Sequence, residues 1–393
     1  MRGRVDELDV APWMELAKRY MPSEGAEKAR LLRSADVEIG RFKGFGMNLE
    51  NLKTSLKRTA SGWSLALDSA PVQGTIALAD TKGAPIVVQL KQVRLPKPPE
   101  NDAEADAKPD PLAGVDPRKV PALDVHIDQV VLGDSPLGAW SFKARPGPQG
   151  VTFSNLDLNL KGLKVGGLAG WEGTAESSSS WYKGRMEGKN LADVLKAWNF
   201  APSVTSERFR MDADGRWPGS PAWVGLKRYS GSMNAHLRNG QFVEVEGGAQ
   251  ALRVFGLLNF NSIRRRLRLD FSDLLGKGLA YDRVRGVLMG SDGRFVTRTP
   301  ITVEGPSSRL ELDGTLDLAA DRVDAKLVVT LPVTNNLPLA ALIVGAPAIG
   351  GALFVVDKLL GDKVARFASV QYKVEGPWKS PSITFDKPFE KPR

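Results

Sequence analysis

Polar and apolar residues alternate over much of this chain, and the alternation limits the folds that it can adopt. In RLELDGTLDL, which begins at Arg309, most even-numbered positions are leucine, and the residues after the next turn alternate in the same way. Because successive side chains of a β-strand point to opposite faces, this pattern predicts strands with one polar and one apolar face. The residues expected on the apolar face are Leu310, Leu312, Leu316, Leu318, Val323, Leu327, Val329 and Leu331.

Helices are expected at only a few places. The spacing of apolar residues predicts short helices near Pro12–Tyr20, Asn190–Asn199 and Ala249–Asn259, with Asn190 as an N-cap. These helices are too few to cover a sheet of the expected size. The sheet can therefore close into a barrel or sandwich, or stay open as a curved trough whose apolar lining holds a ligand. The alternation alone fits both arrangements.

Two internal similarities indicate a repeated body. ADVEIGRFKGFGMNLE, from Ala35, aligns with LDVHIDQVVLGDSPLG, from Leu123, at an offset of 88 residues. GRVDELDVAPWMEL, from Gly3, aligns with GRMEGKNLADVLKA, from Gly184, at an offset of 181, about twice the first. A fixed period of this kind is typical of repeat architectures. DGRWPGSP and EGPWKSP echo each other at strand ends, where Trp217 and Trp378 are expected to cap an apolar face.

The composition excludes several classes of site. The chain has no cysteine, so disulfides, thiol chemistry and cysteine-based zinc sites are ruled out. It has two histidines, His126 and His236, and both lie in alternating segments where solvated strand positions are expected. No P-loop, GxGxxG or HExxH motif is present. We therefore expect a non-enzymatic protein with no catalytic residue, no metal and no cofactor.

The formal net charge of +9 suits nucleic acid, anionic lipid head groups or solubility alone. Nucleic acid is disfavoured because its recognition motifs, and aromatic residues interleaved with the basic run, are missing. In SIRRRLRLDFSDLLGKG, Arg264, Arg265 and Arg266 follow an expected helix. They form either a solvated strand face or a contact with lipid phosphate groups.

One segment interrupts the strand pattern. Residues 96–121, PKPPENDAEADAKPDPLAGVDPRKVP, are rich in proline and acidic in the middle, which predicts a disordered insertion. It separates an expected domain of residues 1–95 from one of residues 122–393. The opening MRGRVDELDV has no apolar core of a signal peptide and leads directly into a strand pattern. We expect the chain to be the C-terminal part of a longer protein.

No charged side chain occurs from Leu327 to Val356. Prolines and glycines interrupt this run, and an apolar stripe continues to Phe367, which predicts a pair of short helices over residues 336–368. The pair either plugs the sheet or lies on a membrane surface, and a true span is less favoured. Candidates for membrane contact are Leu339, Leu342, Ile343, Ile349, Leu353 and Phe354.

The repeats, DGRWPGSP and the stretch ALRVFGLLNFNSIRRRLRLDFSDLLGKGLAYDRVRG resemble the C-terminal part of AsmA-superfamily proteins. The later strands, the uncharged run and YKVEGPWKSPSITF fit the same pattern. The resemblance is strong over Trp181–Asp386 and less specific before it. It implies an elongated, twisted antiparallel sheet curled into a repeat-built hydrophobic groove, with a few short helices and a helical C-terminal tip.

The resemblance also implies a function. Members carry phospholipids between the inner and outer membranes of Gram-negative bacteria, and they are anchored in the inner membrane by an N-terminal segment that this chain lacks. It implies phospholipids and a membrane surface, that of the outer membrane, as partners, and a periplasmic location. Two alternatives stay open: an assembly factor for outer-membrane proteins, and a closed β-scaffold without a lipid ligand.

Overall fold

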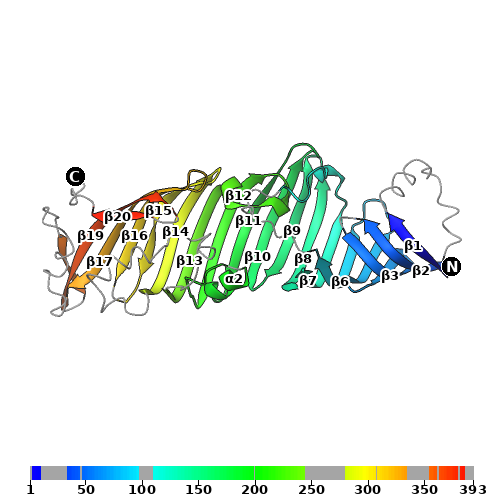
Figure 1. Cartoon of the computed structure of the whole chain (residues 1–393), viewed down its shortest axis with the longest axis horizontal. Coiled ribbons are helices and arrows are strands. Elements are labelled where there is room, and N and C mark those ends of the chain that lie inside the picture. The colour runs from blue at the N-terminus through cyan, green and yellow to red at the C-terminus, as the bar shows by residue number, and fades with distance from the viewer. Residues whose placement is uncertain are drawn as a thin grey trace. The chain divides into compact units, whose positions relative to one another are not determined.

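The structure is a computed structural model of the whole chain. It describes residues 2–9, 33–44, 47–96, 109–198, 200–243, 279–306, 308–333, 354–360, 363–378 and 381–385. The chain divides into two compact units, which are Met1–Ser180 with Gly219–Pro221 (unit 1) and Trp181–Pro218 with Ala222–Arg393 (unit 2). Strands make up most of both units (Figure 1), which confirms the predicted mainly β fold.

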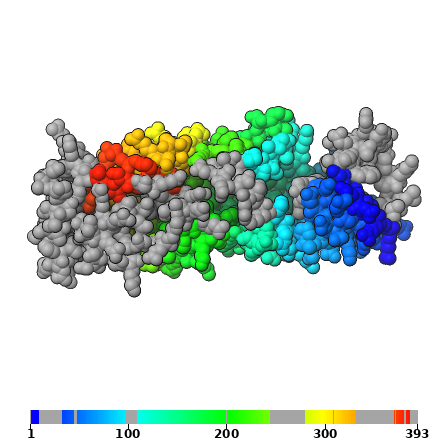
Figure 2. Space-filling view, viewed as in Figure 1, coloured from blue at the N-terminus to red at the C-terminus, as the bar shows by residue number. Residues whose placement is uncertain are grey.

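Unit 1 is a sheet whose strands pair in chain order. Its atoms follow one another from β1 (blue) to β10 (green) in the space-filling view (Figure 2). The strands are β1 (Arg2–Asp9), β2 (Ser34–Gly44), β3 (Met47–Arg58), β4 (Gly62–Asp68), β5 (Val72–Ala79), β6 (Ile86–Leu95), β7 (Leu123–Leu132), β8 (Ser135–Gly147), β9 (Gly150–Leu160) and β10 (Leu163–Gly173). Strand β11 (Ser178–Gly188) begins in unit 1 and continues into unit 2.

Two of these pairs are parallel, β1 with β2 and β6 with β7, and the others are antiparallel. Parallel neighbours need a long crossover, and the sequence supplies one before each of β2 and β7. These are the two strands that the offset of 88 residues aligns, so the repeat coincides with a repeated structural position. Ile39 of β2 and Ile127 of β7 match in that alignment, and both are buried. The alignment therefore reflects a shared arrangement of strand and core.

Unit 2 continues the same construction with antiparallel strands. Its strands are β12 (Arg208–Pro218), β13 (Ser230–Phe242), β14 (Leu279–Ser291), β15 (Arg294–Glu304), β16 (Arg309–Asp317), β17 (Arg322–Val333), β18 (Phe354–Leu360), β19 (Lys363–Pro377) and β20 (Ser382–Phe385). Strand β17 pairs with β19, and both β18 and β20 pair along the opposite edge of β19. Within the described ranges, no pairing joins the first strand of either unit to its last. Each unit is therefore an open, twisted sheet rather than a closed barrel.

Local sequence explains the short elements of unit 2. Helix α2 (Leu191–Ala197) begins where Asn190 accepts a hydrogen bond from the Ala192 N–H, as the sequence predicted. The 3-10 turns η4 (Pro221–Trp223) and η5 (Leu226–Arg228) lead into β13. Asp292 and Gly293 both have positive φ in the two-residue turn between β14 and β15, which is the geometry that favours Asp-Gly in a tight hairpin.

The predicted disorder of residues 96–121 is wrong for the part that the structure describes. Residues 109–121 include a 3-10 turn, η3 (Pro117–Lys119), whose N-cap Asp116 is buried and accepts from the Arg118 N–H. Asp110 accepts two bonds from Ser220, from its N–H at 2.7 Å and its hydroxyl at 2.6 Å. The proline-rich composition suggested disorder because these partners are invisible in the local sequence. Residues 97–108 lie outside the described ranges.

The predicted helical pair over residues 336–368 is also wrong where it can be compared. Residues 354–360 form β18, and residues from Lys363 onward form β19. Strand β19 pairs along most of its length with β17, and this long-range pairing outweighs the helical spacing of a few apolar residues. Phe354, expected in the tip, therefore starts a strand. Residues 334–353 lie outside the described ranges.

Candidate functional site

The apolar residues predicted on β16 and β17 share one face of the sheet. Leu310 lies opposite Val329, Leu312 opposite Leu327 and Leu316 opposite Val323, in register. All six side chains are buried, between 3% and 9% exposed. Leu318 is partly buried and packs against them. Leu331 lies in β17, but its side chain is outside the described set.

These residues belong to a larger apolar cluster that extends across unit 2, which we call the unit 2 core face. Its other buried members include aromatic side chains, of which only Trp217 and Trp378 were predicted from the sequence. The aromatic members are Trp217, Tyr229, Phe242, Tyr281, Phe295, Tyr372 and Trp378. Tyr229 stacks on Phe295 with ring centroids 6.4 Å apart, and Phe242 meets Tyr281 at 5.2 Å. Most of them could have been found in the sequence, because alternation along β12 to β15 places them on the apolar face.

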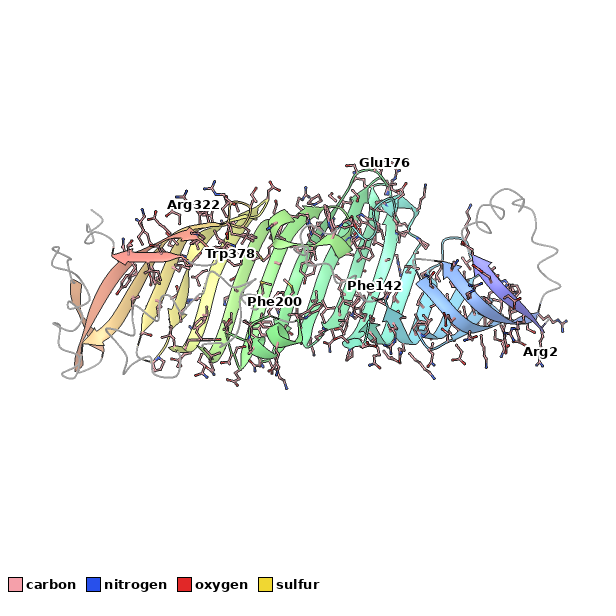
Figure 3. All side chains as sticks on the ribbon, viewed as in Figure 1. Arg2, Phe142, Glu176, Phe200, Arg322 and Trp378 are labelled. Atoms are coloured by element: carbon pink, nitrogen blue, oxygen red, sulfur yellow. The ribbon has the colours of Figure 1, made fainter. Side chains whose placement is uncertain are left out.

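The two tryptophans act as the sequence predicted. Trp217, near the end of β12, and Trp378, just after β19, are both buried in the core face. The Trp378 N–H donates to the Asp321 carbonyl at 3.3 Å, which fixes the turn beside Arg322. Figure 3 shows Arg322 and Trp378 near one another at the same end of the sheet. Each tryptophan therefore closes a strand end over apolar residues.

The polar atoms of this face are paired and uncharged. The Tyr229 hydroxyl donates to the Ser232 carbonyl at 2.8 Å, and the Tyr281 hydroxyl donates to the Thr205 carbonyl. Burial raises the pKa of Tyr229 to about 12 and raises the pKa of Tyr281 as well. Both phenols therefore stay neutral near pH 7, and the face presents carbon atoms and neutral rings to whatever contacts it.

Unit 1 also has a core of aliphatic side chains that come from alternating strand positions. Buried valine, leucine and isoleucine side chains recur along β2 to β9, and a smaller cluster joins Ala144, Val151 and Trp171. Phe142 and Phe153 meet edge-on beside it, with ring centroids 6.0 Å apart, and Phe142 is marked in Figure 3. No lining residue was predicted in this unit, although GWSLALDS and VTFSNLDLNL alternate in the same way.

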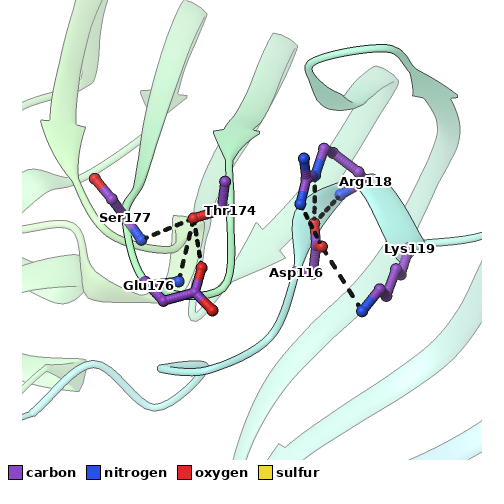
Figure 4. A network of polar contacts seen from close by, with 6 residues as sticks. All are labelled: Asp116, Arg118, Lys119, Thr174, Glu176 and Ser177. Atoms are coloured by element: carbon purple, nitrogen blue, oxygen red, sulfur yellow. Dashed lines mark hydrogen bonds and ion pairs between the residues drawn. The ribbon is translucent and has the colours of Figure 1, made fainter.

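A polar corner of unit 1 contains part of residues 109–121 and the turn between β10 and β11, each with its own hydrogen bonds (Figure 4). Arg118 donates to both carboxylate oxygens of Asp116, at 3.0 and 2.8 Å, and these hydrogen bonds help to lower the pKa of Asp116 to about 2. Thr174 donates to Glu176 and accepts from the Ser177 N–H. A depression of about 450 Å³ beside this corner is lined by polar residues, among them Arg118 and Ser177. The bonds of Asp116 fix the 3-10 turn locally, and those of Thr174 fix the turn between β10 and β11.

Both histidines lie in strands, but only His126 is exposed as predicted. His126 is exposed on β7, and its Nε2 lies 3.1 Å from an oxygen of Asp128. His236 is partly buried on β13, and burial together with the nearby Arg210 lowers its pKa. The described ranges contain no group of three or more histidine, aspartate or glutamate side chains placed to hold a metal ion.

Two further sets of predicted residues cannot be placed. Arg264, Arg265 and Arg266, the expected head-group contacts, lie outside the described residues. So do Leu339, Leu342, Ile343, Ile349 and Leu353 of the expected membrane tip, and the expected helices at Pro12–Tyr20 and Ala249–Asn259. In the part of the chain that the structure describes, no helix has the length and apolar character needed to cross a bilayer.

Comparison with known proteins identifies the family of this chain. The model of the family described as "YhdP protein" matches residues 1–383. The "Intermembrane phospholipid transporter YhdP" of Escherichia coli (strain K12) is 24% identical over 235 residues, which are 59% of this chain and 18% of that protein. The match thus covers less than a fifth of that relative's length. No solved structure matches the chain. The expected resemblance to the AsmA superfamily, in its YhdP-like form, is confirmed, and the chain belongs to the YhdP protein family.

Proposed function

We propose that this chain forms part of a non-enzymatic conduit for phospholipids in the Gram-negative cell envelope. Acyl chains would lie along the apolar faces of the sheets, while head groups stay in water. The family match and the name of the E. coli relative support phospholipid transport between membranes. We further propose that the chain works in the periplasm, as part of a protein anchored in the inner membrane, and delivers lipid to or from the outer membrane.

One observation carries this proposal: an open sheet bears a broad, uncharged apolar face. In unit 2 this face extends from Phe209 on β12 to Val374 on β19. The hydroxyls of Tyr229 and Tyr281 on this face are bound to backbone carbonyls, so they offer little to a specific polar ligand. Such a face suits a ligand that is recognised by its hydrocarbon and not by its functional groups.

The physical chemistry of hydrocarbon transfer makes such a conduit possible without specific contacts. Removing apolar surface from water contributes about 25 cal/mol per Å², or about 0.8 kcal/mol for each methylene group. An acyl chain can therefore be held by many small, similar contacts and can slide between equivalent positions. Leu310, Leu312, Leu316, Leu318, Val323, Leu327, Val329 and Leu331 would line the path on β16 and β17.

Site-specific photo-crosslinking tests the proposal on neighbouring residues that face opposite ways. A photoreactive amino acid replaces Leu312 or Val329 on the apolar face. Glu311 and Lys326, polar neighbours on the same two strands, are the matched controls. After expression in a Gram-negative host and irradiation, mass spectrometry of the intact chain should show an adduct of phospholipid mass at the two apolar positions and not at the controls.

The outcomes separate the alternatives. Polypeptide adducts at the apolar positions would favour an assembly factor with a protein client. Absence of any adduct, together with a lipid-free protein in native mass spectrometry, would favour a scaffold without a lipid ligand and refute the conduit. Equal lipid adducts at the apolar and polar positions would show that the sheet does not select one face.

A further inference from the structure

Arginines stand directly opposite one another across three neighbouring strands on the polar face of unit 2. Arg208 of β12 pairs in register with Arg238 of β13, and Arg238 pairs in register with Arg283 of β14. All three residues are exposed. Directly opposed residues of neighbouring strands lie about 5 Å apart, where like charges repel and destabilise a sheet. Folding alone therefore does not favour this row.

Nearby carboxylates compensate only part of the charge. Continuing the row, Arg283 pairs in register with Glu304, and Glu304 with Arg309. The Glu304 carboxylate is shared, with Arg285 at 2.9 Å, Arg309 at 3.7 Å and Arg283 at 3.9 Å. Within the described ranges, no ion pair joins Arg208 or Arg238 to a carboxylate. Glu304 thus offsets part of the positive charge on β14, whereas the charges of Arg208 on β12 and Arg238 on β13 are not offset by an ion pair in the described ranges.

A second row of residues in register lies beside the first and also contains more arginines than carboxylates. Arg210, His236, Arg285, Thr302 and Glu311 are in register across β12 to β16. Burial and the positive charge of Arg210 lower the pKa of His236, so this histidine adds no charge near pH 7. The two rows together hold six arginines and two glutamates. Asp212 of β12 also pairs with Arg210, at 3.0 Å, which leaves a formal excess of three positive charges.

Exposed apolar residues lie farther along the same strands. Met289 of β14 stands opposite Val296 of β15, and they are 38% and 42% exposed. Met289 is four residues beyond Arg285, a distance of about 13 Å along a strand. Cationic side chains close to exposed apolar ones are the combination found on surfaces that rest on a membrane interface, with the cations at phosphate level.

From these observations we propose that the rows formed by Arg208, Arg238 and Arg283 and by Arg210 and Arg285 are a docking surface for an anionic phospholipid membrane. The guanidinium groups bind lipid phosphates, for which their planar fork is suited. Met289 and Val296 contact the hydrocarbon boundary. This surface lies on the polar face, opposite to the proposed lipid path, so it does not depend on that path.

The test measures binding of the full 393-residue chain to vesicles of phosphatidylcholine with and without phosphatidylglycerol. The double variant Arg208→Gln/Arg238→Gln leaves the ion pairs of Glu304 intact. Each basic residue near an anionic surface strengthens binding about 5-fold, so the variant should bind phosphatidylglycerol vesicles about 25-fold more weakly. Its thermal midpoint should stay equal or rise, because the like-charge pairing is relieved.

A control variant removes the same charge from a second like-charged pair, on more distant strands of unit 2. Lys326 of β17 and Lys373 of β19 are in register, and Lys326→Gln/Lys373→Gln should change vesicle binding less than about 3-fold, since β17 lies three strands, about 14 Å, from β14. Equal losses in the two double variants would overturn the proposal, because any surface charge would then serve. So would failure of the unmodified chain to bind phosphatidylglycerol vesicles, or equally tight binding to pure phosphatidylcholine. Co-purified lipid is measured in the Arg208→Gln/Arg238→Gln variant as well. If the variant keeps this lipid but loses vesicle binding, the membrane-docking surface is distinct from the proposed conduit.

Discussion

The contact between Asp110 and Ser220 gives the sharpest test of how unit 1 is held together. Ser220 is fully buried, and its N–H and hydroxyl donate to the two carboxylate oxygens of Asp110 at 2.7 and 2.6 Å. The same carboxylate accepts from the Leu112 N–H at 2.9 Å. These bonds join segments 110 residues apart, and without them residues 109–121 lose their main polar attachment to Gly219–Pro221.

We predict that Asp110→Ala lowers the free energy of unfolding by about 3–5 kcal/mol. A hydrogen bond to a charged group is worth about 1.5–3 kcal/mol, and the substitution removes two such bonds from the buried Ser220. Urea unfolding followed by tryptophan fluorescence gives the free energy. Hydrogen exchange over residues 109–121 reports whether the segment has come loose, and exchange there should accelerate in the variant.

Asp128→Ala is the matched control. Its side chain is 64% exposed and is paired with His126, which is itself 60% exposed, so the loss should stay below about 1 kcal/mol. The reasoning fails if the two variants are equally stable. It also fails if residues 109–121 of the unmodified chain exchange as fast as an unstructured peptide, because the segment would then be as disordered as its composition suggested.

Two further predictions concern the unit 2 core face. Burial raises the folded-state pKa of Tyr229 to about 12, so its contribution to stability is complete below pH 10 and is lost as the pH rises through 12. Between pH 10 and 12 this residue should lower the free energy of unfolding by about 1.4 kcal/mol per pH unit, in addition to what Tyr281 and Tyr182 contribute. Tyr229→Phe should make the total slope shallower by that amount, and an unchanged slope would refute the assignment. Trp217→Ala should lower the free energy of unfolding in denaturant by about 3–5 kcal/mol, because the side chain is only 7% exposed within the cluster. The control Val224→Ala, at a side chain that is 56% exposed, should lower it by less than about 0.5 kcal/mol. Similar losses in both variants would show that Trp217 does not cap the core.

The sequence predicted the elements whose signals are local. Alternation placed Leu310 and Leu312 on the buried face of β16, and Asn190 marked the start of α2. The tight turn at Asp292-Gly293 follows from two residues that tolerate positive φ. In each case the determining interaction lies within one strand, one helical turn or one hairpin.

The parts that were mispredicted depend on distant partners. Residues 109–121 are ordered by Ser220, which no local pattern reveals. In β18 and β19, a short run of apolar residues fits helical spacing. Ala368, Val370, Tyr372 and Val374 also alternate as in a strand, and pairing with β17 stabilises the strand conformation. The arginine row needed the register of three strands, because Arg208, Arg238 and Arg283 are far apart in sequence.

The parallel pairs in unit 1 have a consequence for how such a sheet can grow. Strands β2 to β6 are five in number, so β6 runs in the same direction as β2, and a parallel junction gives β7 that direction again. Each repeat therefore starts with the same orientation. Neighbouring strands are spaced by about 4.8 Å, so one repeat of five strands adds about 24 Å of length. Evolution can set the reach of the protein in whole steps of this size and leave the cross-section of the sheet unchanged.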